Sequence, residues 1–124
     1  MANYFPCPFN IVVPGNSIGN LSSFPLLTAK RIVEILMTFP SGTNLNFGYR
    51  FYLLPGPPNN TTSLPSGSEI VAPFIIPGIF AGDGVTYTVP FSIPIIPPNT
   101  ILCMAAINNT ATAFTAEAIA ILAG

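Results

Sequence analysis

The fold class of this sequence is decided by one stretch, LNFGYRFYLL at residues 45–54. Apolar side chains occupy every second position of this stretch, and successive side chains of a strand point to opposite faces of a sheet. The alternation therefore predicts a β-strand with one face in a core. The residues expected on that face are Leu45, Phe47, Tyr49, Phe51 and Leu53.

Apolar runs of similar length recur along the chain, and turns rich in glycine, proline and asparagine separate them. Two of the runs contain a proline, Pro73 or Pro90, and we expect these at a sheet edge or a bulge because proline cannot donate a ladder hydrogen bond. The expected strands are AKRIVEILMTF (29–39), EIVAPFII (69–76), VTYTVPFSI (85–93), TILCMAAIN (100–108) and AFTAEAIAIL (113–122).

The alanine-rich last run could form a helix by propensity alone, but its interleaved β-branched and aromatic residues favour a strand. Strands separated by frequent turn signals are typical of all-β folds. We therefore predict a single antiparallel β-sandwich or jelly roll, at residues 28–124, with an extended N-terminal arm at residues 1–27. In its first strand, one face is expected to hold Arg31, Val33, Ile35, Met37 and Phe39.

The composition points to a chain that is covered by copies of itself. Half of the 124 residues are hydrophobic and 6% are charged, against roughly 25% in an ordinary soluble domain. With a net charge of -1, little repulsion keeps such chains apart. Three basic residues cannot form a nucleic-acid footprint, and 15 prolines interrupt nearly every run that could span a membrane.

The sequence contains no catalytic constellation. Histidine is absent, which removes the commonest general base and metal ligand. The carboxylates Glu34, Glu69, Asp83 and Glu117 are scattered along the chain. Two cysteines without histidine make a zinc site implausible. We therefore expect no enzyme activity, no cofactor, no metal and no small-molecule ligand.

Two polar features have alternative readings. Asp83 in AGDG could suggest a calcium turn, but Asp-Gly is a strong hairpin-turn signal and we expect a turn. Lys30, Arg31 and Glu34 cluster at the start of the first core strand, where they could pair across subunits. We favour a solvated strand edge that discourages wrong pairing. Asn-x-Ser/Thr sequons begin at Asn20, Asn59, Asn60 and Asn108, and we read them as chance matches.

The N-terminal segment MANYFPCPFNIVVPG carries no charge and places Cys7 between two prolines. Proline fixes its own φ and makes the preceding residue extended, so this arm is pre-extended. An extended peptide can add to a sheet edge of a neighbouring subunit. The residues expected to do this are Phe5, Phe9, Ile11, Val12 and Val13.

The second cysteine, Cys103, lies in the expected strand at residues 100–108. A cysteine in such a run is often a buried small hydrophobe. We expect the arm to reach a neighbouring subunit, where Cys7 would cross-link to that subunit's Cys103. A bridge from the arm to Cys103 of its own chain is the alternative.

The chain from Ile32 to Gly124 resembles the C-terminal β-domains of bacterial exosporium glycoproteins, the collagen-like proteins of the spore surface. Four pieces carry the resemblance: NFGYRFYLLPGPPNNT, GSEIVAPFIIPGI, VPFSIPIIPPNTILCMAAINN and TAEAIAILAG. The chain departs from that family because it holds no Gly-X-Y repeat.

In general plan the chain also resembles spore appendage pilins, which join a small jelly roll to a short N-terminal connector with cysteine. That resemblance implies that residues 1–20 reach into neighbouring subunits and that Cys7 links them by a disulfide. The paired cysteines usual in that family are missing here.

These observations together predict a structural subunit that self-assembles into an extracellular fibre or surface appendage, as a helical filament of identical chains. Residues 1–20 lack the basic segment of a secretory signal. We therefore expect the chain to reach a cell or spore surface by another route, such as mother-cell lysis. The alternatives are a trimeric lectin-like module, with Tyr49, Tyr52 or Tyr87 stacking on sugar, and a viral capsid or decoration protein.

Overall fold

A computed structural model describes residues 3–65, 68–69 and 80–124 of the chain. Those residues contain strands and turns but no helix, and so no helix that is long and apolar enough to cross a membrane. The strands are β1 (Tyr4–Val13), β2 (Ser17–Ser22), β3 (Arg31–Thr38), β4 (Phe47–Leu54), β5 (Ser68–Glu69), β6 (Phe80–Ala81), β7 (Thr86–Pro94), β8 (Ile101–Asn108) and β9 (Phe114–Ala123).

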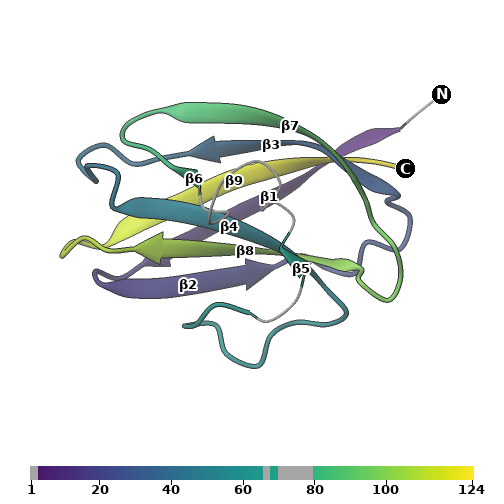
Figure 1. The fold of residues 1–124 in the computed structure, drawn as a ribbon, viewed down its shortest axis with the longest axis horizontal. Coiled ribbons are helices and arrows are strands. Elements are labelled where there is room, and N and C mark those ends of the chain that lie inside the picture. Colours follow the sequence, from purple (N-terminus) through teal and green to yellow (C-terminus); the bar gives the residue numbers. More distant parts are fainter. Residues whose placement is uncertain (1–2, 66–67, 70–79) are drawn as a thin grey trace.

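The strands form two antiparallel sheets that face each other across one core (Figure 1). Sheet A has the order β1-β9-β3-β7, and sheet B has the order β2-β8-β4-β5, with β6 also pairing with β4. The chain crosses repeatedly between the sheets, which is the connectivity of a jelly roll. The predicted fold class is therefore confirmed, and the alanine-rich C-terminus is strand β9.

The stretch at residues 45–54 follows its predicted alternation over most of its length. Phe47, Tyr49, Phe51 and Leu53 all lie in the core between the sheets. Leu45 differs, because it lies in a turn before β4 with a φ of 64° and is exposed. Pro90 lies in β7, an edge strand of sheet A, as expected. Pro73 and most of the expected strand EIVAPFII fall outside the described residues.

Strand β3 corrects the predicted face of the run at residues 29–39. Its pairing with β7 and β9 shifts between Ile32 and Glu34, so the strand holds a bulge at Val33. One extra residue reverses the alternation. Ile32 therefore points into the core with Ile35, whereas Arg31 lies on the opposite, outer face. Because β3 pairs on both sides, the charged cluster does not guard a strand edge.

The segment at residues 1–27 also differs from the expected free connector. Strand β1 pairs with β9 of its own chain at all ten positions, and β2 pairs with β8. Strand β1 joins the sandwich of its own chain because every second residue of the strand packs into the core. A proline fits an edge strand where its missing N–H would face away from the partner, so Pro6 and Pro8 are compatible with β1. In the single chain, the sandwich therefore begins at Tyr4.

Tyr49 ties the two sheets together. From β4 its hydroxyl donates a hydrogen bond to the Thr38 carbonyl oxygen at 2.6 Å. The same hydroxyl accepts a hydrogen bond from the Glu117 backbone N–H at 2.8 Å. Thr38 and Glu117 oppose each other in the β3–β9 pair, so one side chain of sheet B satisfies two backbone groups of sheet A. Burial raises the pKa of Tyr49 to about 12.

Asn108 forms a second junction, at the end of β8. Its side-chain amide donates hydrogen bonds to the carbonyl oxygens of Val13, Pro14 and Thr112 at 2.8–3.1 Å. Its oxygen accepts hydrogen bonds from the backbone N–H and the hydroxyl of Thr110. This fully buried side chain holds the end of β1 against the turn between β8 and β9.

Candidate functional site

The acidic residues and cysteines form no metal-binding cluster in the described part of the chain. No group of three histidine, cysteine or acidic residues lies close enough there to hold a metal ion. Asp83 has a structural role, because its carboxylate accepts hydrogen bonds from the backbone N–H groups of Gly42 at 2.8 Å and Asn44 at 3.1 Å. The turn expected at AGDG is thus fastened to a neighbouring loop.

The two cysteines lie on different sides of sheet B. Cys7 points inward from β1 and packs against the core, whereas Cys103 points outward from β8 into a small separate cluster. Both are free thiols, so the bridge within one chain that we considered is not formed. Burial raises the pKa of each thiol, which disfavours the thiolate needed for disulfide exchange.

The chain's own loop at residues 55–65 is fastened to β2 on the outer side of sheet B. The Asn20 backbone N–H donates to the Thr61 carbonyl oxygen at 2.9 Å. The Asn20 side chain donates to the carbonyl oxygens of Asn60 and Ser63 at 2.9 and 2.8 Å. These bonds hold the loop to β2. Four side chains that point away from the core on this side form a small buried cluster of their own: Tyr52, Leu54, Cys103 and Ala105.

The burial of asparagine and tyrosine side chains tests two interpretations of the sequence, glycan attachment and sugar stacking. Asn20 and Asn108 are buried, which excludes them as glycan acceptors in the folded chain. Asn59 and Asn60 are exposed in the loop. The suggestion that Tyr49 and Tyr52 stack on sugar is wrong for this structure, because both side chains are buried. Tyr87 alone of the three proposed tyrosines is exposed, at 46%.

The outer face of sheet A, in contrast, has no cover from the described residues. Its apolar side chains include Val12, which is 63% exposed, and Ile119, which is 40% exposed. A shallow hollow of about 260 Å³ runs over β9 between β1 and β3. The outward residues of this face are Tyr4, Pro6, Pro8, Asn10 and Val12 of β1, Thr115, Glu117, Ile119 and Ile121 of β9, Arg31, Glu34, Leu36 and Thr38 of β3, and Thr86, Thr88 and Pro90 of β7.

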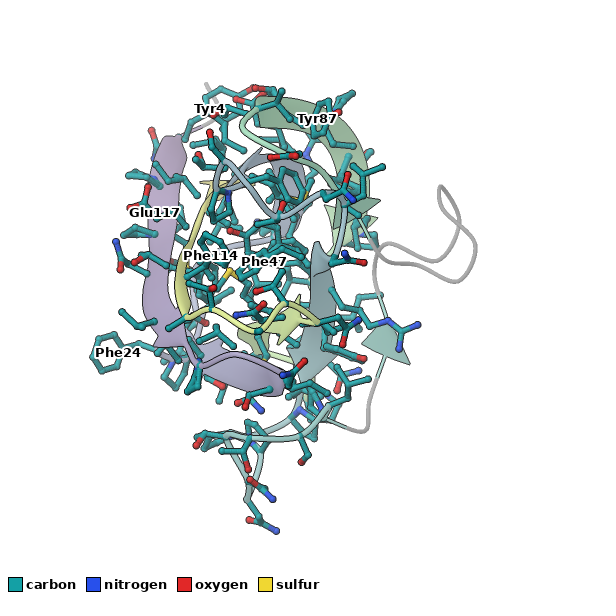
Figure 2. The ribbon with its side chains drawn as sticks, turned by 90° about the vertical axis from the view of Figure 1, so that its left-hand side faces the viewer. Tyr4, Phe24, Phe47, Tyr87, Phe114 and Glu117 are labelled. Carbon is teal, nitrogen blue, oxygen red and sulfur yellow. The ribbon has the colours of Figure 1, made fainter. Side chains whose placement is uncertain are left out.

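A second apolar region lies in the segment that follows β2, at residues 24–27. Phe24 is 91% exposed and Leu27 is 82% exposed. In Figure 2, Phe24 points away from the body of the protein, whereas Phe47 and Phe114 point into the core. A groove of about 330 Å³ separates this segment from β1, and Cys7 contributes to its wall.

The residues proposed for the arm strand divide between two environments. Phe9 and Val13 are buried in the core of their own chain, and Phe5 and Ile11 pack against it. Val12 points outward. The alternation of β1 could have revealed this division, because Phe5, Cys7, Phe9, Ile11 and Val13 occupy every second position.

No protein family model and no curated protein matches this chain. Among solved structures, the chain is similar to the major capsid protein P2 of bacteriophage PM2, with 15% identity and a TM-score of 0.46. That alignment covers 98% of this chain but 45% of P2, so the chain spans less than half the length of P2.

Two further solved structures are similar at a comparable level. The mitogen of Yersinia pseudotuberculosis has 12% identity and a TM-score of 0.42, with 96% of this chain and 84% of the mitogen covered. The capsid of cyanophage Pam1 has 13% identity and a TM-score of 0.47, with 98% and 84% covered. These likenesses assign no function to this chain.

Proposed function

We propose that this chain is a structural, non-enzymatic subunit that assembles with copies of itself into an extracellular fibre or appendage at a cell or spore surface. The observation that carries the proposal is the set of large apolar side chains left in solvent by a chain with 6% charged residues. Burial of such side chains against another chain is favourable. The most exposed of these side chains are Phe24, Leu27, Leu45, Ile96, Val12 and Tyr4.

Covering several of these side chains in one interface would favour assembly. Burial of one large apolar side chain is worth about 1.5–3 kcal/mol. A few such side chains in one interface offset the loss of translational and rotational freedom on association, which is roughly 4–15 kcal/mol. The low net charge opposes this gain only weakly.

Exchange of β1 supplies a route for the arm insertion that the sequence suggested. This strand lies at the edge of sheet A and joins β2 through residues 14–16 alone. A neighbour's β1 would make the same contacts beside β9, so exchange changes few interactions and depends on concentration. Short hinges of this kind favour exchange between chains.

A pair of engineered cysteines tests the exchange. Val12 and Thr115 oppose each other in the β1–β9 pair and both point outward. Pro6 and Pro8 lack an N–H, so they must occupy non-hydrogen-bonded positions of the β1–β9 pair. Such positions recur at every second residue, so Val12 occupies one too. The Cα atoms of Val12 and Thr115 are therefore about 4.5 Å apart. That separation suits a disulfide. The variant carries Val12→Cys and Thr115→Cys, with Cys7→Ala and Cys103→Ala to remove the native thiols.

The protein is refolded at high concentration, oxidised and separated on a denaturing, non-reducing gel. Exchanged strands give a ladder of covalently linked chains, which ends at three chains if the assembly is a closed trimer. Strands that stay in their own chain give internally bridged monomers at every concentration, which would contradict the exchange. Val12→Cys without Thr115→Cys is the matched control, and it can form dimers at most.

A further inference from the structure

Apart from Glu34, the charges of sheet A are separated along the strands. Lys30 and Arg31 lie at one end, where Arg31 opposes Pro94 and Ala123. Glu117 lies at the other end, where it opposes Thr38. Asp83 lies at the same end, in the loop that leads into β7. The ends are roughly 20 Å apart at the rise of a β-strand, too far for Arg31 and Glu117 to pair within one chain.

The surface between these ends is mainly apolar. Leu36, Ile119 and Ile121 alternate with the buried residues of β3 and β9 and therefore point outward. Glu34 is the remaining charged residue on the face, and it lies two positions from Arg31 in the pairing, nearer the basic end. The hollow at the acidic end is bounded by Asn10, Thr86, Glu117 and Ile119. An apolar centre with charges at its ends is the usual layout of a protein interface.

We infer that a second copy of this chain covers the outer face of sheet A, turned end for end so that the basic end of one copy meets the acidic end of the other. This arrangement places Arg31 of each copy opposite Glu117 of its partner and buries Leu36 and Ile119 between them. A two-fold contact makes each pairing twice. The inference rests on the proposed self-assembly, and it supplies the second interface that exchange of β1 needs to extend beyond a closed pair.

Charge reversal tests this arrangement. Arg31→Glu alone and Glu117→Arg alone should each weaken association at least tenfold, because each places like charges together at both ends of the contact. An equimolar mixture of the two variants should associate as strongly as the original protein, since each meets its opposite. The chain that carries both substitutions should also recover. Sedimentation velocity over a concentration series measures all four samples.

The matched control for Arg31→Glu adds the same two units of negative charge to the loop at residues 55–65, by Asn59→Glu with Thr61→Glu. Association of this control should equal that of the unaltered chain. Thermal unfolding of each variant at a concentration where all are monomeric shows whether the fold is intact, because Arg31 and Glu117 point into solvent.

The outcomes separate the two claims. If the unaltered chain assembles and both single variants assemble equally well, the outer face of sheet A is not the interface, and the proposed function stands. If the single variants are weakened but neither the mixture nor the double variant recovers, the end-for-end pairing is wrong. If the unaltered chain is monomeric at every concentration, the proposed self-assembly fails together with the inference.

Discussion

The two sheets of this protein treat their outer faces differently. On sheet B, the loop at residues 55–65 bonds to Asn20, and an outward cluster around Cys103 is buried. On sheet A, outward side chains such as Val12 and Ile119 have no such cover. The connections explain the contrast, because β4 is followed by a long loop that folds back. One face carries a loop of its own chain, and the other is available to a second chain.

The junction at Asn108 holds the two sheets together, so its loss should have the largest effect. Asn108→Ala removes a fully buried amide and leaves the carbonyl oxygens of Val13, Pro14 and Thr112 without this donor. We expect a loss of about 3–5 kcal/mol in the free energy of unfolding. Urea unfolding followed by circular dichroism measures it. Asn59→Ala, in the exposed loop, should change stability by less than about 0.5 kcal/mol.

The Tyr49 hydroxyl should have the next largest effect. Tyr49→Phe keeps the ring but removes the bonds to Thr38 and Glu117. We expect a loss of about 1–3 kcal/mol, because buried backbone groups lose their partner. A stability loss below the uncertainty of denaturant unfolding would show that the hydroxyl does not tie the sheets together.

The same residue predicts a dependence on alkaline pH. The pKa of Tyr49 is raised from 10.0 to about 12 in the folded chain. The stability from this shift is therefore complete below pH 10 and is lost as the pH rises toward 12. The difference in unfolding free energy between the original chain and Tyr49→Phe should shrink over that range. A difference that stays constant from pH 9 to 12 would contradict the assignment.

The smallest expected effects on stability come from substitutions on the outer faces of the two sheets. Cys103→Ser places a hydroxyl in the buried cluster on sheet B and should cost about 1–3 kcal/mol. Ile119→Ser makes a polar change on the outer face of sheet A, where Ile119 is 40% exposed, and should cost about 1 kcal/mol or less of monomer stability. Thermal unfolding of the two variants at low concentration compares them. Equal losses would mean that the two faces are equally covered.

The sequence predicted the features that depend on local alternation. The strand at Phe47–Leu54, the strand nature of the alanine-rich C-terminus and the edge position of Pro90 all follow from side-chain period and proline chemistry. The bulge at Val33 was missed, because nothing local marks the position where one residue shifts the register. Its consequence was large, since it decides that Arg31 points outward.

The candidate site was less predictable because it depends on which segments meet. The prolines of β1 suggested a free arm, although they are equally compatible with an edge strand whose other residues enter the core. The different sides on which Cys7 and Cys103 lie follow from the order of strands in two sheets. That order involves residues far apart in the chain, so neighbouring residues did not reveal it.

The central claim is that copies of this chain bury the outer face of sheet A. Sedimentation velocity of the original chain and of Ile119→Ser, over the same concentration series, tests it most directly. The account predicts concentration-dependent assembly of the original chain and a clear shift of Ile119→Ser toward the monomer, with the monomer still folded. Assembly of Ile119→Ser that matches the original chain at every concentration would contradict the account.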